Sequence, residues 1–358
     1  MATVPRIAVI GGGKFGLMHL RAFVQLQLEG KAELVALADV NPRVLEERRE
    51  QFALRTYTNH VEMLEKEKPD GASIATPDFL HRQIALDCLA RGVHVLVEKP
   101  LDTSVAGCQQ MASAASARGL LLQVDFHKRY DAYHQEMARA VHEGKIGKVL
   151  YGYAWMEDRI EVPRDWFPSW APKSSPCWFL GVHMFDLIYW TIRSKPKKVF
   201  ASASREKLRS LGIDAYDSVC TTVTFENGAT FTVQASWILP EKFEAVVNQG
   251  IRIVGTEGVI EIDSQDRGSR VCTSADGMMT YNLGFFFESK DRKGRTVYGG
   301  YGIQSIQEFA FNVAHLLDGG TLADLEGAYA GANDGIVSTA IAAASHESIQ
   351  SGMAVSIE

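Results

Sequence analysis

Three glycines with the spacing G-x-G-x-x-G directly follow a short apolar stretch near the start of the chain. The stretch runs from Arg6 to Ile10, and a glycine at its end lets the backbone turn sharply. The middle glycine leaves space for a pyrophosphate, and the third lets the following helix pack closely on the sheet. Unpaired N–H groups at the start of that helix favour an anion. The spacing therefore predicts a dinucleotide-binding turn made of Gly11, Gly13, Lys14, Phe15 and Gly16.

An aspartate, Asp39, ends the next apolar run, which begins at Glu33. A carboxylate at the end of the second strand accepts hydrogen bonds from the adenosine ribose hydroxyls and repels a phosphate on one of them. NAD is therefore the expected cofactor. Arg43 lies just beyond and is within reach of a 2′-phosphate, so NADP is the less favoured alternative, although we expect Arg43 to be a solvated residue of a first helical turn.

Two polar segments follow later apolar runs, where the carboxyl ends of parallel strands bind ligands. The first contains Thr76 and Pro77, with His81 one turn into the next helix, and the second is Glu98-Lys99-Pro100. A lysine here could hydrogen-bond a substrate hydroxyl and stabilise the alkoxide that forms as hydride leaves. The alternative is a charge that only caps the end of a strand. We expect Thr76, Pro77, His81, Glu98 and Lys99 to contact the cofactor, and Lys99 also the substrate.

Strands and helices alternate through about the first 125 residues. Apolar runs at 72–75, 93–97 and 120–124 are separated by helical patterns at about 78–91 and 103–118. This alternation is typical of parallel strands joined by crossover helices. Residues 1–125 are therefore predicted to form an NAD-binding Rossmann domain with a doubly wound parallel sheet.

The pattern changes from about residue 150. Period-two stretches at 218–225 and 229–235 are joined by the turn 226–228, which predicts an antiparallel hairpin. A second pair of strands flanks 255–258, residues 264–300 are the least predictable, and two helices are expected near 303–317 and 323–350. The expected fold is α/β plus α+β: residues 126–358 form a mostly antiparallel open sheet with helices on one face, and the last helices are able to pack back on the Rossmann domain.

The composition is that of a soluble enzyme: 358 residues, 46% apolar and 22% charged. A net charge of -6 argues against nucleic acid or a membrane surface as the main partner. No apolar run approaches twenty residues and no basic segment precedes an apolar core at the N-terminus, so we expect a cytoplasmic protein. The five cysteines are scattered without disulfide or ligand spacing, and no metal is predicted.

The sequence resembles the glucose-fructose oxidoreductase, inositol dehydrogenase and rhizopine catabolism family, Gfo/Idh/MocA. The resemblance rests first on the glycine turn, Asp39, the stretch from Thr76 to His81, and Glu98-Lys99-Pro100. The agreement continues to the C-terminus in several separate motifs. They are Phe126-His-Lys-Arg-Tyr130, Gly144-Lys-Ile-Gly147, Gly181-Val-His183-Met-Phe-Asp186 and Gly255-Thr-Glu-Gly258. The resemblance implies hydride transfer between a nicotinamide cofactor and a secondary alcohol of a sugar, inositol or sugar derivative. It also implies a homodimer or homotetramer formed through the antiparallel sheet.

The resemblance places His183 as the acid/base group and Lys99 as the group that polarises the same oxygen. Histidine suits this step because its unperturbed pKa of roughly 6.5 lies near working pH. Asp186 follows three positions later, within reach on one helical face. Many members carry an aspartate four residues before the histidine, but this chain has Phe179 there. We expect Asp186 or a backbone carbonyl to orient the ring instead.

Tryptophans gather between residues 155 and 190 among charged and proline residues. Flat rings beside hydrogen-bonding groups suit a carbohydrate, although such rings also often pack in a core. The candidate substrate-binding residues are Lys99, His127, Arg164, Trp166, His183 and Asp186. Two other functions remain open: an enzyme that modifies or cleaves a glycoside by transient sugar oxidation with recycled NAD, and a nicotinamide-sensing regulator without catalysis.

Overall fold

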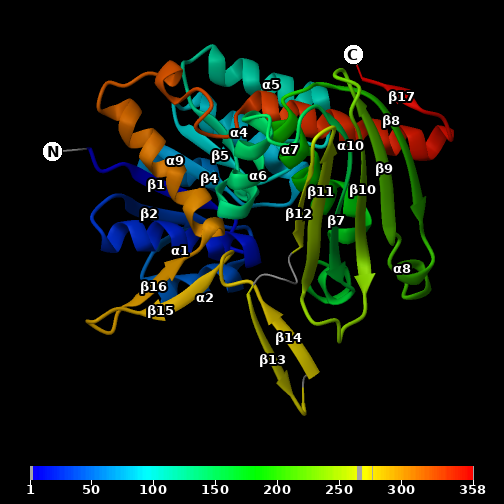
Figure 1. The fold of residues 1–358 in the computed structure, drawn as a ribbon. Helices are drawn as coiled ribbons and strands as arrows, with labels where there is room; N and C mark the ends of the chain where they lie inside the picture. Colours follow the sequence, from blue (N-terminus) through cyan, green and yellow to red (C-terminus); the bar gives the residue numbers. More distant parts are fainter. Residues whose placement is uncertain (1–2, 264–267, 276, 358) are drawn as a thin grey trace. The chain divides into compact units, whose positions relative to one another are not determined.

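The computed structural model describes residues 3–263, 268–275 and 277–357, and the chain forms two compact units (Figure 1). Unit 1 comprises Met1–Tyr130 and Phe285–Ile336, and unit 2 comprises Asp131–Gly284 and Val337–Glu358. The sequence predicts a single domain boundary after residue 125. The division into units differs from it because the chain returns to unit 1 at Phe285. Within that returning segment, helix α9 (Tyr301–Leu317) packs on α1 (Lys14–Leu28).

Unit 1 is built on a six-stranded sheet in the order β3-β2-β1-β4-β5-β6, and every neighbouring pair is parallel. This is the doubly wound Rossmann order, so the predicted fold of the N-terminal region is confirmed. The strands are β1 (Arg6–Ile10), β2 (Glu33–Ala38), β3 (Arg55–Tyr57), β4 (Gly71–Ile74), β5 (His94–Val97) and β6 (Leu122–Val124).

Helices cover both faces of this sheet because alternate strand residues point to opposite sides. In β1, Ala8 and Ile10 join the apolar cluster that contains side chains of α3 (His60–Glu67), α4 (His81–Ala90) and α5 (Val105–Ser116). Ile7 and Val9 face the other side, with α1, α2 (Pro42–Phe52) and α9. Strands buried on both faces are therefore continuous apolar runs in the sequence.

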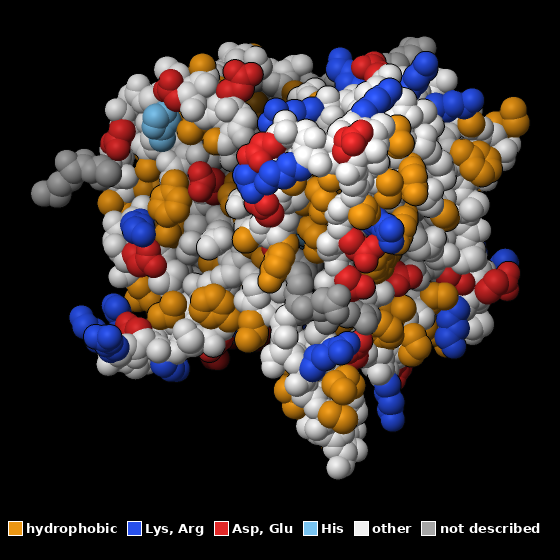
Figure 2. Space-filling model, viewed as in Figure 1, with side chains coloured by type: hydrophobic (Ala, Val, Ile, Leu, Met, Phe, Trp, Pro, Cys, Tyr) orange, Lys and Arg blue, Asp and Glu red, His pale blue; other side chains and the backbone are white. Residues whose placement is uncertain are grey.

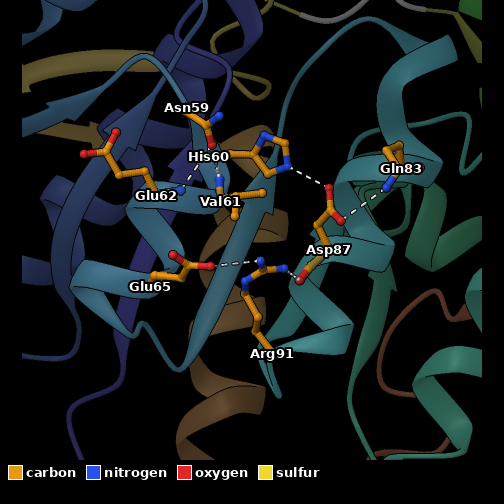
Figure 3. A network of polar contacts seen from close by, with 8 residues as sticks. All are labelled: Asn59, His60, Val61, Glu62, Glu65, Gln83, Asp87 and Arg91. Atoms are coloured by element: carbon orange, nitrogen blue, oxygen red, sulfur yellow. Dashed lines mark hydrogen bonds and ion pairs between the residues drawn. The ribbon is translucent and has the colours of Figure 1, made fainter.

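A polar network joins α3 to α4 on the surface of unit 1 (Figure 3). His60 Nε2 lies 3.0 Å from a carboxylate oxygen of Asp87, whose other oxygen accepts a hydrogen bond from Gln83. Arg91 donates to the backbone carbonyl of Asp87 and to Glu65. These contacts account for His60 as a structural residue.

Unit 2 is built on a seven-stranded sheet in the order β12-β11-β7-β10-β9-β8-β17. Only the β10–β7 pair among these strands is parallel, so the predicted mostly antiparallel sheet is confirmed. The predicted hairpin is β9 and β10, with Gly228 at φ +87° in its turn. The strands are β7 (Val149–Arg159), β8 (Pro196–Ser204), β9 (Ser218–Phe225), β10 (Thr230–Leu239), β11 (Val247–Gly255), β12 (Val259–Asp263) and β17 (Val355–Ser356).

One face of this sheet packs on helices α7 (Val182–Ile192) and α10 (Ala332–Ser351), in a core that includes Phe185, Val233 and Ile341. The helices α6 (Ala132–His142) and α8 (Lys207–Ser210) also belong to unit 2. The opposite side of β7 carries Tyr151 and Tyr153, which are 53% and 43% exposed. The sheet therefore presents aromatic side chains to solvent on its uncovered face.

The last predicted helix is partly wrong, because residues 323–350 are not one continuous helix. A short 3₁₀ helix, η7 (Leu322–Leu325), is separated from α10 by a turn in which Gly327 has φ +80°. The chain then runs alongside β6, where Val124 N–H donates to the Ala330 carbonyl and Gln123 bridges to Gly331. Pairing with the edge of the sheet replaces the helix here.

The segment that was least predictable contains two hairpins in its described part. The strands β13 (Ser269–Thr273) and β14 (Gly277–Tyr281) belong to unit 2, and β15 (Phe287–Lys290) and β16 (Thr296–Gly299) belong to unit 1. The first hairpin carries exposed apolar side chains, among them Val271, Met278 and Tyr281 (Figure 2). Within the described ranges no helix is long and apolar enough to cross a membrane. All five cysteines are free thiols.

Candidate active site

The glycine turn leaves β1 and enters α1 with little room for any side chain. Gly11 has φ +97°, and a Cβ there would collide with the backbone of Ala75. A Cβ on Gly16 would collide with the carbonyl of Gly11. These two positions therefore require glycine for the turn itself and for close packing of α1.

Gly13 differs, because a Cβ there would meet no described atom within 4 Å. It is the residue before α1, and as a glycine it has no side chain that could cap the helix by a hydrogen bond. The positive end of the α1 helix dipole thus lies beside the open space at Gly13. Thr76 Oγ1, nearby in the loop that packs on Gly11, is buried without a hydrogen-bond partner among the described residues. The turn fits a diphosphate.

Asp39 is held by two backbone donors. Its Oδ2 accepts from Gly12 N–H at 2.7 Å and its Oδ1 accepts from Asn41 N–H at 2.8 Å. Each oxygen keeps a lone pair for a ribose hydroxyl. The Arg43 side chain is 88% exposed and pairs with Glu47 at 3.2 Å, as expected of a solvated residue. Sequence reasoning missed Arg48, whose Nε donates to the Gly12 carbonyl at 3.1 Å.

His81 joins the two loops that follow β4 and β5. Its buried ring places Nδ1 2.7 Å from the Pro100 carbonyl and Nε2 2.9 Å from the Thr76 carbonyl. A neutral imidazole has one N–H and donates to only one of these carbonyls at a time. The geometry gives His81 the task of holding Thr76 and Pro100 in place. Contact of His81, Thr76 and Pro77 with a cofactor stays a prediction.

Lys99 lies at the carboxyl end of β5, as predicted, and is only 6% exposed. Its ammonium is 5.4 Å from the centroid of the Phe15 ring, the aromatic residue of the glycine turn. The structure therefore brings Lys99 to the predicted dinucleotide turn. A buried ammonium at this edge is not a solvated cap.

Glu98, the residue before Lys99, is bonded within unit 1 through both oxygens. Oε1 lies 3.1 Å from Nε2 of His19, and Oε2 accepts from Lys99 N–H at 3.1 Å. His19 Nδ1 is 2.6 Å from Ser73 Oγ. We assign the Nε2 proton to the bond with Glu98, which leaves Nδ1 to accept from the serine hydroxyl.

Asp125 directly follows β6 and completes a buried cluster with His19 and Glu98. Its Oδ2 is 3.9 Å from His19 Nε2. One side-chain nitrogen or oxygen atom from each of the three residues lies within 4.8 Å of the other two. Burial raises the pKa of Asp125 to about 7, and the charge of Glu98 acts in the same direction. Burial alone would also raise the pKa of Glu98, but the hydrogen bond from His19 and the charge of Lys99 outweigh it and hold that pKa below its ordinary value.

The predicted substrate residue His127 is buried in unit 1 between aromatic rings. Its ring centroid is 5.1 Å from that of Phe285 and 5.9 Å from that of Tyr301. Burial and the adjacent charge of Lys128 lower the pKa of His127 to about 3, so the ring is neutral at physiological pH. Its surroundings favour a packing role.

His183 and Asp186 belong to unit 2, while Lys99 belongs to unit 1. His183 is the second residue of α7, which continues from a turn of π-helix over Cys177–Gly181. His183 is 3% exposed and Asp186 is 1% exposed. The signature therefore sits at a helix start, where a π-helical turn is often part of a functional site.

Phe179 occupies an aromatic cluster in unit 2. Its ring centroid lies 5.1 Å from Trp170, 5.9 Å from Phe167 and 6.0 Å from Trp237. Edge-to-face packing of this kind stabilises aromatic side chains beyond simple burial. The position at which the family resemblance implies an aspartate therefore holds a partly buried aromatic ring packed against the apolar core.

Arg164 and Trp166 lie in a second π-helical turn, Val162–Trp166. The Arg164 guanidinium binds both oxygens of Asp165, at 2.8 and 2.6 Å, and also Glu241. Trp166 is 37% exposed. Arg164 would have to release a carboxylate to bind a substrate, whereas the Trp166 side chain is partly exposed.

Sequence reasoning missed His19, Ser73 and Asp125. Asp125 gives the same signal as Asp39, a carboxylate directly after an apolar strand. His19 stands on the face of α1 that packs against the sheet, where a histidine between Met18 and Leu20 needs a polar partner. Its partner Glu98 is 79 residues away in the chain, so only the fold reveals the pair.

The fold and the glycine turn define a dinucleotide-binding enzyme with a Rossmann domain. Residues 5–126 match the family model described as an oxidoreductase family with an NAD-binding Rossmann fold, and residues 134–261 match the C-terminal domain model of the same family. The chain belongs to the Gfo/Idh/MocA family. It is therefore an NAD-binding oxidoreductase.

Known relatives span most of the chain. A myo-inositol 2-dehydrogenase from Thermotoga maritima is 25% identical over 293 residues, covering 80% of this chain and 84% of the relative. The structure of a myo-inositol 2-dehydrogenase from Lactobacillus plantarum matches with a TM-score of 0.80 at 21% identity, covering 99% of this chain and 100% of the other. That of scyllo-inositol dehydrogenase from Lactobacillus casei, with bound NAD(H) and scyllo-inositol, matches with a TM-score of 0.79 at 19% identity and 99% coverage of both chains. The two solved structures show the same fold.

Proposed function

We propose that this chain oxidises a secondary alcohol of an inositol or a related sugar, with Lys99 polarising the hydroxyl oxygen and His183 accepting its proton. The observation that carries the proposal is the buried Lys99 ammonium at the carboxyl end of β5, beside Phe15 of the dinucleotide turn. The inositol dehydrogenases among the relatives support a cyclic polyol as the substrate.

Bound NAD⁺ would accept the hydride from the carbinol carbon. As that C–H bond breaks, the hydroxyl proton must also leave, and a neutral imidazole at His183 is suited to take it. The Lys99 ammonium donates a hydrogen bond to the oxygen and stabilises the negative charge that develops there. The products are a ketone, NADH and a proton. The reverse direction would use the same two groups for ketone reduction.

The cofactor-binding residues that we propose are the glycine turn, Asp39 and the loops held by His81. Gly13 and the start of α1 would hold the diphosphate, and Asp39 the adenosine ribose. Trp166 and, after release of a carboxylate, Arg164 would contact the substrate with Asp186. The expected compartment is the cytoplasm.

We further propose that unit 2 forms dimers or tetramers through the uncovered face of its sheet. Tyr151 and Tyr153 on β7 are exposed there, and Trp155 stacks on Tyr153 with centroids 5.9 Å apart. Large exposed aromatic side chains on one sheet face are typical of a subunit interface.

The aromatic environment of Phe179 favours one alternative reaction. Without the usual aspartate beside His183, net polyol oxidation could be replaced by transient oxidation at a sugar carbon, which modifies or cleaves a glycoside and regenerates NAD. Such an enzyme would change a glycoside without net formation of NADH.

A substrate panel with two variants tests the proposal. Inositols, free sugars, sugar phosphates and glycosides are screened with NAD and NADP, following NADH absorbance and product formation separately. For the best substrate, Lys99→Met and His183→Asn should each lower kcat by about 10²-fold or more, and the Kd for NADH should change much less than kcat in both variants. His94→Gln, in the same sheet but at the amino end of β5, is the control. Equal losses of turnover and cofactor affinity in both variants would contradict these roles, and product without NADH would favour the glycoside reaction.

A further inference from the structure

Three buried ionisable side chains lie together beside Lys99, and the hydride-transfer scheme gives none of them a task. His19 comes from α1, Glu98 from the end of β5, and Asp125 from the end of β6. None of the three is more than 7% exposed. His19 Nε2 is 3.1 Å from Glu98 and 3.9 Å from Asp125. Three separate elements thus bring their polar groups to one point at the ligand-binding edge of the sheet.

The charge balance of this cluster requires one proton. With His19 in the tautomer assigned from its contacts with Glu98 and Ser73, two ionised carboxylates beside the single Lys99 ammonium would leave one uncompensated negative charge in the interior. Burying such a charge is costly, and a group in this position retains a proton instead. Glu98 has hydrogen-bond donors on both oxygens, whereas Asp125 Oδ1 has no hydrogen-bond partner among the described residues. The proton therefore belongs on Asp125.

Other polar groups around Asp125 do not change this assignment. Ser305 of α9 acts on its carboxyl group without adding charge, and the Ser305 hydroxyl donates to the Gly302 carbonyl at 3.2 Å. Tyr130 is close enough to feel its charge, and burial raises the pKa of that phenol, so Tyr130 is neutral. His127 is also neutral, as described above. Glu98 and Lys99 supply the charges, and His19 the imidazole, that act on the pKa of Asp125.

The cluster reaches Lys99 through Glu98. One oxygen of Glu98 is fixed by His19, and the other accepts from the backbone N–H of Lys99. The orientation of this carboxylate therefore fixes the peptide that carries Lys99. An ionised Asp125 would repel the Glu98 carboxylate. It would also compete with Glu98 for the Nε2–H of His19, because Asp125 Oδ2 is only 3.9 Å from that nitrogen.

We propose that His19 and Asp125 are positioning residues for Lys99, and that one proton held on Asp125 keeps Glu98 bonded to His19 and to the Lys99 backbone. The inference rests on the proposed function, because it assumes that Lys99 acts on the substrate. Loss of the proton rearranges Glu98 and displaces Lys99. The expected result is an enzyme whose turnover falls as Asp125 ionises, with little change in NAD affinity.

The proton can be observed without any substrate. The full chain with bound NADH is labelled with ¹³C at aspartate carboxyl carbons and titrated by NMR, and Asp125→Asn assigns the Asp125 signal. A carboxyl that titrates near neutral pH and vanishes in Asp125→Asn is the expected result. The proposal is overturned if every aspartate carboxyl titrates near the ordinary value of about 3.9. It is also overturned if the purified protein holds one equivalent of metal that Asp125→Asn removes.

The positioning role is tested by the ratio of kcat in Asp125→Asn to kcat in the wild type, measured against pH. Asparagine mimics the protonated acid, so the ratio should be constant below about pH 6 and rise about tenfold per pH unit above about pH 8. The ratio cancels the pH dependence of the hydride transfer itself. A ratio that stays constant across the range would overturn the proposal.

A second variant tests His19 directly. His19→Ala should lower kcat about tenfold or more at every pH, with the Kd for NADH within about threefold. His94→Gln is the matched control, since His94 is a histidine of the same sheet whose Nδ1 accepts from Leu121 N–H. Equal effects of both variants on kcat would contradict the role of His19. The wild type could show no turnover on any polyol and still have a carboxyl group that titrates near neutral pH. That result would refute the proposed function but would leave the proton on Asp125 established.

Discussion

The carboxylate of Asp39 accepts a hydrogen bond from the backbone N–H of Gly12, with Oδ2 2.7 Å from the nitrogen. The end of β2 is thereby fixed to the glycine turn after β1, two segments that a dinucleotide would contact at its ribose and diphosphate. The Asn41 N–H, 2.8 Å from Oδ1, completes the orientation of the carboxylate. A charge held this firmly discriminates between a ribose hydroxyl and a ribose phosphate.

Asp39→Ser is therefore expected to weaken NADH binding and to reduce the preference for NADH over NADPH. Loss of a charge-assisted hydrogen bond costs about 1.5–3 kcal/mol, so the Kd for NADH should rise about tenfold or more. The Kd for NADPH should change much less, because the repulsion is also removed. Fluorescence titration with both cofactors measures this. Arg43→Ala is the control, since that side chain pairs with Glu47 in solvent, and a larger effect of Arg43→Ala on either cofactor would contradict the assignment.

Local chemistry was enough to predict the turn and Asp39, because both depend on residues close in the sequence. The hairpin around Gly228 was predictable for the same reason. The helix expected over 323–350 failed where the Ala330 carbonyl pairs with β6, a partner two hundred residues away in the chain. The His19–Glu98 pair was also missed, because each residue alone reads as an ordinary helix or strand-end position. Contacts between distant segments are what the sequence pattern does not contain.

Gly13→Ala should separate cofactor binding from folding. The added methyl group meets no described atom within 4 Å, so the thermal midpoint should shift by no more than about 2 °C. It would occupy the space proposed for the diphosphate, and the Kd for NADH should rise about tenfold. Calorimetry and fluorescence titration give the two values. Gly331→Ala, where a Cβ would have only ordinary contacts, is the control. A large loss of stability without loss of affinity would refute this use of Gly13.

Phe179→Asp is expected to destabilise the protein and not to create the aspartate–histidine pair that the family resemblance implies. The carboxylate would be placed among the rings of Phe167, Trp170 and Trp237, in a partly buried position. A cost of about 3–5 kcal/mol in the free energy of unfolding is expected. Urea unfolding measures it, with Phe179→Leu as the smaller apolar control. Higher turnover in Phe179→Asp at unchanged stability would show that this position can still serve His183.

Tyr153→Glu tests the proposed interface on β7. A charge in the middle of an apolar contact between subunits would be buried without a partner, so the oligomer should dissociate. Light scattering after size-exclusion chromatography gives the mass of each variant. Tyr133→Glu is the matched control, because Tyr133 is 59% exposed on α6, away from the sheet face. A wild type that is monomeric, or a Tyr153→Glu variant of unchanged mass, would refute the interface.

Asp125→Asn should stabilise the folded protein above neutral pH. In the folded state the pKa of Asp125 is raised to about 7, whereas the unfolded chain has the ordinary value near 3.8. Between these values the folded state holds a proton that the unfolded state has lost. The free energy of unfolding therefore falls as pH rises from about 4 to about 7, by up to about 1.4 kcal/mol per unit of pKa difference. The amide of Asp125→Asn does not ionise, so the free energy of unfolding of this variant does not fall for this reason.

Thermal midpoints measured from pH 5 to about pH 9.5 should show a gap between Asp125→Asn and the wild type that widens with pH and becomes constant above about pH 8. Asp214→Asn, at an aspartate whose side chain is 76% exposed, reports the effect of amide substitution alone. A gap that narrows as pH rises would mean that Asp125 is stabilised as the ion. In that case a cation other than a proton would have to compensate the charge of Asp125. The position of the proton on His19 would then have to be assigned again.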